Sequence, residues 1–195
     1  VDLNQRSREI AVERGMVDVV TDDLRSAIRD ADTVALCAPV RVILSLVRGR
    51  LGAYLRSNTF VIDIGSTKED ICEAMGQLPI GVQAMGGHPM TGKETSGLEG
   101  SDGGLYKARP FVLCPTRRTT PAARLRAFAF VEALGGEAIE MDAHRHDRTV
   151  AAISHLPYLL SAALVATVKS EGDKDGAVWQ LAAGGFRDTS RLAAS

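Results

Sequence analysis

Short apolar runs alternate with stretches of helical periodicity over the first two thirds of the chain. Strands are predicted at residues 33–38, 60–64, 81–85, 110–113 and 138–141. Helices are predicted at residues 5–14, 23–30, 40–55, 68–75 and 122–134. Strands that are apolar throughout are typically buried on both faces, and their alternation with helices is typical of a doubly wound, mostly parallel sheet. The predicted fold class is therefore α/β.

From His144 onward the pattern becomes helical only. One long apolar helix is predicted over residues 148–169, with a kink at Pro157, because proline has no N–H to donate to the preceding turn. Two shorter helices are predicted over residues 175–183 and 186–194.

This change of pattern predicts two domains. Residues 1–142 would form the α/β domain, and residues 143–195 would form the start of an all-helical domain. The sequence begins with Val1 and stops at Ser195 in mid-pattern. We therefore expect a fragment of a longer protein, with the helical domain truncated.

Acidic and basic side chains nearly cancel, 24 against 23, which gives a formal net charge of −1. This balance argues against a broad surface for nucleic acid or for anionic membranes. Hydrophobic residues make up 45% of the chain, which is typical of a globular protein and excludes disorder over its bulk. The apolar run over residues 156–168 is too short to span a bilayer. We expect a cytoplasmic protein with no nucleic-acid partner and no membrane partner.

The cysteines and two of the histidines give no sign of a disulfide or a metal site. Cys37, Cys72 and Cys114 lie far apart, and this spacing favours reduced, buried thiols in the cytosol. His144 and His146 resemble a metal pair only superficially, because no third ligand lies at metal spacing. A solvated loop is predicted there, and no metal is expected.

Ligands of doubly wound sheets bind outside the carboxyl ends of the strands. The first predicted strand runs into Ala38, Pro39 and Val40, where a helix begins. Unpaired backbone amides at such a helix start can lie against a cofactor. An ordinary strand-to-helix turn is the alternative interpretation.

Gly65 and Ser66 follow the second predicted strand. Glycine lets the backbone approach a ligand closely, and the Ser66 hydroxyl could donate to a substrate or a cofactor. Alternatively, Ser66 or Thr67 caps the helix predicted over residues 68–75. The two interpretations are compatible.

Asp2 precedes a helix that Asn4 can cap. An acidic residue at a strand end, about 20 residues beyond a glycine-rich turn, accepts hydrogen bonds from the adenosine ribose of NAD. That turn would lie upstream of Val1. A helix cap or a solvated acid is the alternative, and Arg6 could instead favour the 2′-phosphate of NADP, so both cofactors are open.

His88 follows Gly86 and Gly87 at the end of the third predicted strand and is fixed in front of Pro89. A histidine at a strand's carboxyl end is a good candidate for a general base, because its unperturbed pKa is about 6.5. The glycines would allow a flat cofactor ring to approach. A purely structural histidine is the alternative.

Three further candidates lie in the helical part. His155 sits beside the kink expected at Pro157, where it either meets a ligand or bonds a helix carbonyl in the core. Arg187 and Arg191 are four residues apart and share one helix face, which suits the recognition of a carboxylate. A surface helix with ion pairs is the alternative.

Four segments are more informative in combination than each is alone. They are DIGSTK at 63–68, GGHPMTGKETSG at 86–97, HDRTVAAISHLPYLLSAALV at 146–165 and AAGGFRDTSRLAAS at 182–195. In this order they resemble the prephenate/arogenate dehydrogenase family of tyrosine biosynthesis, over nearly the whole chain. The resemblance implies a Rossmann-like domain followed by a helical substrate and dimerisation domain, and therefore a homodimer in the full-length protein.

The resemblance also implies a reaction. Prephenate or arogenate would give a hydride from its ring carbinol carbon to NAD, with NADP possible, while the ring carboxylate leaves as CO2. His88 would take the hydroxyl proton, and Ser66 would orient the hydroxyl and the nicotinamide. The implied substrate contacts are His155, Arg191, Arg187 and Glu94.

Two departures and two competing functions accompany this resemblance. Many relatives carry a histidine where this chain has Tyr158 and a phenylalanine where it has Thr189. One alternative is another Rossmann-type enzyme, a 3-hydroxyacid dehydrogenase or an imine reductase. The other is a non-catalytic nucleotide-binding or dimerisation module.

Overall fold

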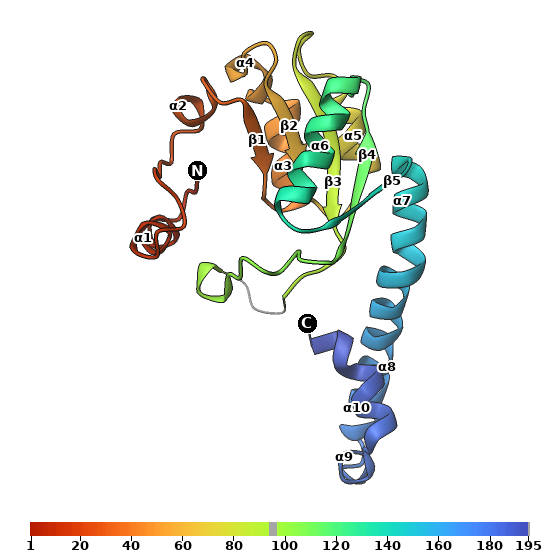
Figure 1. The fold of residues 1–195 in the computed structure, drawn as a ribbon. Helices are drawn as coiled ribbons and strands as arrows, with labels where there is room; N and C mark the ends of the chain where they lie inside the picture. Colours follow the sequence, from red (N-terminus) through yellow and green to blue (C-terminus); the bar gives the residue numbers. More distant parts are fainter. Residues whose placement is uncertain (94–96, 195) are drawn as a thin grey trace. The chain divides into compact units, whose positions relative to one another are not determined.

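A five-stranded sheet forms the centre of the N-terminal part of the chain (Figure 1). The computed structural model describes residues 1–93 and 97–194. The strands lie in chain order, as β1 (Thr33–Leu36), β2 (Phe60–Asp63), β3 (Gln83–Pro89), β4 (Pro110–Pro115) and β5 (Glu137–Glu140). Only the β3–β4 pair is antiparallel among these neighbours, so the prediction of a mostly parallel sheet is confirmed.

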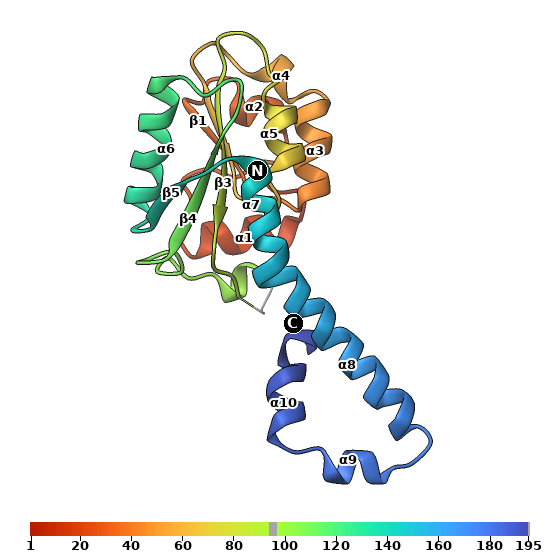
Figure 2. The ribbon, with the colours of Figure 1, turned by 90° about the vertical axis from the view of Figure 1, so that its right-hand side faces the viewer.

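Helices cover both faces of this sheet. Figure 2 shows α6 (Pro121–Ala133) on one face, and α3 (Val40–Arg48) and α5 (Glu69–Met75) on the other. Alternate residues of β2 face the two layers, because successive side chains of a strand point to opposite faces. Phe60 and Ile62 pack with α6, whereas Val61 packs with α3 and α5. The doubly wound arrangement is therefore confirmed.

The strands differ in how completely they are buried. All four residues of β2 are buried, as its unbroken apolar run predicts. In β1, which lies at the edge of the sheet, Val34 and Leu36 are buried while Thr33 and Ala35 are exposed. The expectation of burial on both faces is therefore wrong for β1.

A glycine explains where one predicted helix breaks. The helix predicted over residues 40–55 is divided into α3 and α4 (Leu51–Tyr54) at Gly49. A Cβ at Gly49 would lie 2.7 Å from the carbonyl oxygen of Ser45, so this turn requires glycine. The remaining helices of the N-terminal part are α1 (Gln5–Glu13) and α2 (Leu24–Ile28), with a 3-10 turn at Leu98–Gly100.

The second part of the chain is helical, as predicted. Its elements are α7 (Ala143–Val150), a π-helical turn (Ala151–His155), α8 (Leu156–Gly172), α9 (Ala177–Leu181), α10 (Gly184–Ser190) and a 3-10 turn (Arg191–Ala194). The π-helical turn ends two residues before Pro157, in the region where a kink was predicted. A Cβ at Gly172 would collide with the ring of Trp179, so glycine is needed where the chain leaves α8.

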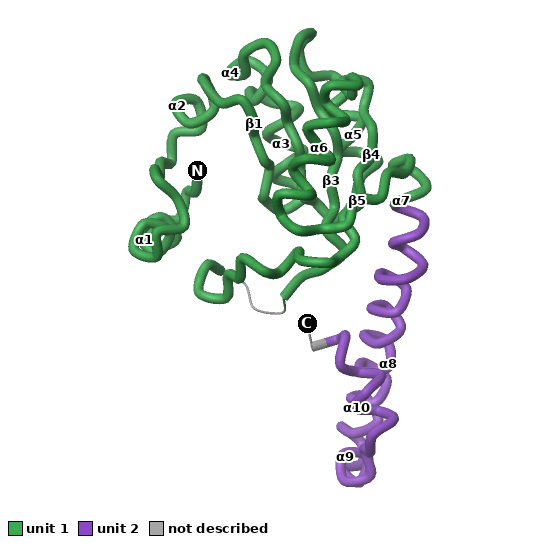
Figure 3. The backbone as a smooth tube through the Cα atoms, viewed as in Figure 1, with its two compact units in different colours: residues 1–146 green, residues 147–195 purple. Residues whose placement is uncertain are grey.

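Contacts divide the chain into two compact units, Val1–His146 and Asp147–Ser195 (Figure 3). This division falls inside α7, four residues beyond the predicted domain boundary at 142/143, which stays a prediction. Within the second unit, α8 packs against α9, α10 and the final 3-10 turn.

By length and composition alone, the helix over Ala143–Gly172 could span a membrane. The expectation that the apolar run is too short is therefore wrong for the helix as it forms, because α7 and the π-helical turn extend it. A long apolar helix that packs against a protein partner has the same length and composition. The absence of a membrane partner stays a prediction.

Candidate active site

Three parallel strands bring their carboxyl ends to one edge of the sheet. Leu36 of β1 lies level with Asp63 of β2, and Ile62 of β2 lies level with Met85 of β3. The turn into α3, the loop from β2 to α5 and the end of β3 therefore meet at this edge. This is the edge at which open α/β sheets bind ligands.

A buried ion pair lies directly beneath this edge. The side chains of Asp63 and Lys68 are both 0% exposed, and the Lys68 ammonium donates to the Asp63 carboxylate. Lys68 Nζ also donates to the carbonyl oxygen of Gly87 at 2.7 Å. The Asp63 carboxylate accepts from the amides of Gly65 at 2.8 Å and Gly87 at 3.1 Å.

This pair joins the loop after β2 to the end of β3. Burial raises the pKa of the Asp63 carboxyl group above its usual value, and Lys68 with the two amides offsets only part of that effect. Sequence reasoning missed the pair. The available signal was an acid at the end of an apolar strand with a lysine five residues later.

Gly86 and Gly87 are required by packing inside the protein. A Cβ at Gly86 would lie 2.5 Å from Cys72 Sγ, and one at Gly87 would lie 2.5 Å from the carbonyl oxygen of Asp63. Protein atoms thus fill the space towards which both side chains would point. Packing therefore explains both glycines, and the approach of a flat cofactor ring stays a prediction.

His88 is the second-last residue of β3 and is half-buried. His88 and Gly86 lie on the same face of the strand, because they are two residues apart. This is the face that packs against Cys72 of α5. Its Nδ1 lies 2.8 Å from Nε2 of His146, and the two rings meet edge to face with centroids 5.0 Å apart.

His146 is 1% exposed and lies on α7, so the prediction of a solvated loop is wrong for this residue. The residues around His146 in the sequence are mostly polar, so its helical spacing to Val150 was overlooked. His146 and Val150 are four residues apart, and both are buried on one face of the helix. His144 is exposed and contacts the Glu69 carboxylate at 3.2 Å.

The turn into α3 offers backbone donors at the same edge. Pro39 precedes the helix, and no side chain caps its first turn. Ala38 and Val40 on either side are half-buried. Uncapped amides at the start of a nine-residue helix suit an anionic or oxygen-rich ligand.

The loop after β2 contributes Gly65 and Ser66. Gly65 is buried, and a Cβ there would lie 2.9 Å from Ile71 and 3.0 Å from the Asp63 carboxylate. Ser66 is exposed. Lys68, rather than Ser66 or Thr67, is the residue that precedes α5, so the predicted cap is wrong.

Asp2 lies outside any strand and is exposed. Its carboxylate accepts from the Asn4 amide at 2.7 Å, while Asn4 itself caps α1 as predicted. Arg6 is engaged with Glu9 on the surface of the helix. The ribose contact of Asp2 and the choice between NAD and NADP remain predictions.

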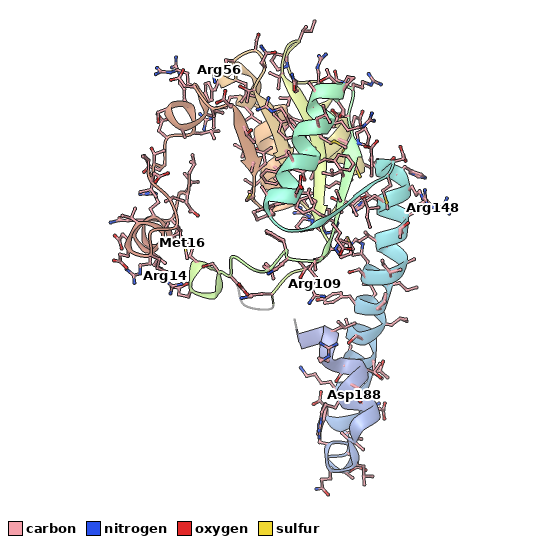
Figure 4. The ribbon with its side chains drawn as sticks, in the orientation of Figure 1. Arg14, Met16, Arg56, Arg109, Arg148 and Asp188 are labelled. Carbon is pink, nitrogen blue, oxygen red and sulfur yellow. The ribbon has the colours of Figure 1, made fainter. Side chains whose placement is uncertain are left out.

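The 3-10 turn at Leu98–Gly100, in the loop between β3 and β4, packs against α1. Arg14 donates to the carbonyl oxygens of Leu98 at 3.1 Å and Glu99 at 3.3 Å, and Figure 4 shows Arg14 and Met16 beside this loop. Glu94, a predicted substrate contact, falls outside the described residues.

Three predicted substrate contacts belong to the second unit and are exposed there. His155 ends the π-helical turn, Arg187 lies on α10, and Arg191 begins the final 3-10 turn. Their roles towards a substrate remain predictions. The structure thus brings together the α3 turn, Gly65, Ser66 and His88, all within the first unit.

The cysteines differ in exposure. Cys72 and Cys114 are buried as predicted, but Cys37 is exposed, which corrects the expectation for that residue. Within residues 1–93 and 97–194, no group of three or more metal-binding side chains occurs.

A surface cavity of about 480 Å³ lies among the carboxyl ends of α3 and α5, whose helix dipoles disfavour an anionic ligand.

Fold and site define an α/β nucleotide-binding domain with a histidine at the ligand-binding edge, followed by a helical unit. Residues 1–140 match the family model of the prephenate dehydrogenase nucleotide-binding domain, and residues 142–195 match that of the prephenate dehydrogenase dimerization domain. The chain therefore belongs to the prephenate dehydrogenase family, as its motifs indicate.

Individual relatives agree with this assignment. The chain is 31% identical to a cyclohexadienyl dehydrogenase of Zymomonas mobilis, over 100% of this chain and 66% of that protein. It is similar to the crystal structure of Synechocystis arogenate dehydrogenase, with 36% identity and a TM-score of 0.82 over 100% of this chain and 69% of that one.

A second solved structure is the prephenate dehydrogenase of A. aeolicus in complex with hydroxyphenyl propionate and NAD+. The similarity has 30% identity and a TM-score of 0.86, over 100% of this chain and 68% of that chain. The chain spans about half to two thirds of the length of three curated relatives that it matches.

Proposed function

We propose that the protein containing this chain oxidatively decarboxylates prephenate or arogenate, with hydride transfer to NAD+ or NADP+. The observation that carries the proposal is His88, held at the carboxyl edge of a nucleotide-binding sheet in a chain of this family. The products would be 4-hydroxyphenylpyruvate from prephenate or tyrosine from arogenate.

The residues at the edge fit a dinucleotide. Uncapped amides after Pro39 would face an oxygen-rich group, and Ala38 and Val40 would flank it. Gly65 and Ser66 would border the nicotinamide, with Asp2 as the candidate for the adenosine ribose. The nicotinamide, when bound, supplies the acceptor for the hydride.

His88 acts on the hydroxyl group of the substrate ring. Since Nδ1 engages His146, Nε2 is the atom that takes the hydroxyl proton as the carbinol hydrogen leaves as hydride. Loss of CO2 then makes the ring aromatic. The product keeps a phenolic hydroxyl, so the proton returns from Nε2 to that oxygen and none is consumed overall.

The other residues position the substrate. The Ser66 hydroxyl forms a hydrogen bond with the reacting hydroxyl group of the substrate. This bond orients the substrate for hydride transfer. Arg191 binds a substrate carboxylate, with Arg187, His155 and Glu94 as further contacts. A guanidinium group suits this task because it donates two parallel hydrogen bonds to a carboxylate.

We further propose that the helical unit pairs two copies of the full-length protein. Large apolar side chains are exposed along α8, including Leu159 at 62% and Leu160 at 61%. A contiguous apolar surface of this kind favours a protein partner. The match to a dimerization domain supports a second copy as that partner. A cytoplasmic enzyme without a membrane or nucleic-acid partner fits this proposal.

The test follows NADH or NADPH absorbance in the full-length protein. Prephenate and arogenate are supplied separately, each with NAD+ and with NADP+. Turnover of either substrate supports the proposal. The rates then identify which of the two substrates and which of the two cofactors the protein prefers. A folded protein that binds the dinucleotide but converts neither substrate contradicts it and favours another Rossmann-type dehydrogenase or a binding module.

A further inference from the structure

His88 and His146 form a pair whose geometry restricts how either ring can carry its proton. The 2.8 Å separation of His88 Nδ1 and His146 Nε2 is a hydrogen-bond distance. When both rings are neutral, one of these two nitrogens must carry the proton and the other must accept it.

Only one of the two arrangements makes His88 a base at Nε2. If His146 donates, His88 carries its own proton on Nε2 and has no lone pair there for a substrate proton. If His88 donates from Nδ1, its Nε2 has a lone pair, and His146 must carry its proton on Nδ1.

We propose that His146 is a positioning residue that accepts the Nδ1 hydrogen bond of His88 and so fixes His88 in the tautomer with an unprotonated Nε2. This inference rests on the proposed function for its catalytic consequence. It adds a residue outside the sheet, on α7, to the site formed by β3 and the loop after β2.

Burial of His146 makes it suitable for this task. Its side chain is 1% exposed, so packing restrains the ring, whereas His88 is half-buried near the carboxyl end of β3. When His88 takes a proton at Nε2, its Nδ1–H becomes a stronger donor, and the bond to His146 strengthens. His146 thereby orients His88 and stabilises its protonated form, as the third member of a catalytic triad does.

The first measurement reads the tautomers directly in the full-length wild-type protein. Nitrogen NMR of 15N-histidine-labelled protein, with His88 assigned by comparison with His88→Asn, reports which ring nitrogen carries the proton. We expect neutral His88 to be protonated on Nδ1 and unprotonated on Nε2. Protonation of neutral His88 on Nε2 would overturn the proposal, whatever the protein catalyses.

The second measurement compares two substitutions at position 146. His146→Gln keeps an acceptor oxygen near the position of Nε2, whereas His146→Leu removes it. We expect His146→Leu to lower kcat by roughly 10²-fold with KM changed by less than about threefold, and His146→Gln to recover most of the loss. Equal activity of the leucine variant and wild type would overturn the proposal.

His144→Leu is the matched control, because His144 lies on the same helix, is exposed and contacts Glu69 instead. We expect it to leave kcat unchanged. Thermal unfolding shows whether each variant is folded, and the NMR result stands even if the leucine variant is not. Absence of turnover in wild type would contradict the proposed function, while the tautomer measurement would still test the histidine pair.

Discussion

The two compact units bury their apolar side chains to very different extents. In Val1–His146, both faces of the sheet are covered by helices, and residues such as Val61 and Ile71 are fully buried. In Asp147–Ser195, Ser161 is buried while Leu159, Leu160 and Leu181 are largely exposed. The first unit therefore specifies its own core, whereas the second presents an apolar surface suited to a partner.

This difference separates two kinds of substitution. A substitution in the closely packed core of the first unit should alter folding stability. A change on the exposed face of α8 should alter association and leave the first unit intact.

Lys68→Met should produce the largest loss of stability. Removing one partner of a buried pair leaves the other charge uncompensated and costs about 3–5 kcal/mol of unfolding free energy. Chemical denaturation measures the loss. The double variant Asp63→Asn/Lys68→Met should be more stable than Lys68→Met alone, and an equally unstable double variant would contradict this account.

The loss in Lys68→Met should also depend on pH. The pKa of Asp63 is already raised by burial, and removing the ammonium raises it further. The folded variant then binds a proton more tightly than the unfolded chain, so its stability falls as pH rises through the raised pKa. Denaturation at pH 4 and pH 8 should show the smaller deficit, relative to wild type, at pH 4. A larger deficit at pH 4 would argue against an unpaired Asp63.

Leu160→Asp should weaken dimerisation of the full-length protein without unfolding the first unit. A charge on the exposed apolar face of α8 should raise the dimer Kd by at least about tenfold, because burying it at an interface is costly. Analytical ultracentrifugation measures this change. Lys169→Gln on the same helix is the control and should leave the Kd near the wild-type value. An unchanged Kd for Leu160→Asp would show that this face does not lie in the interface.

Gly86→Ala should destabilise the first unit by about 1–3 kcal/mol, because its Cβ would lie 2.5 Å from Cys72 Sγ. Gly92→Ala is the matched control, since a Cβ at Gly92 meets no atom within 4 Å. Thermal unfolding of the two variants gives the comparison. Equal stability of both would mean that the strand end is looser than its packing indicates.

Hydrophobic pattern predicted the sheet well where local burial decides the structure. The apolar run of β2 is buried at every position, and Gly49 explains the division of the helix predicted over residues 40–55. The edge position of β1 could not be read from its own residues, because the exposure of a strand depends on which strands neighbour it.

The predictable part of the site was the part carried by single residues at strand ends. Ser66 follows β2 and His88 is the second-last residue of β3, and the parallel pairing of these strands brings their ends to one edge. The Asp63–Lys68 pair and the His88–His146 contact join residues from separate elements. Their partners are fixed by tertiary packing, which the sequence pattern of either element alone does not determine.

We propose that His88 is the base of a dehydrogenase that oxidises prephenate or arogenate. The most direct test compares the full-length wild type with His88→Asn, measuring kcat for the preferred substrate and the Kd of the dinucleotide. We expect a fall in kcat of about 10²–10⁴-fold, with the dinucleotide Kd unchanged. Undiminished turnover by a folded His88→Asn protein would contradict it.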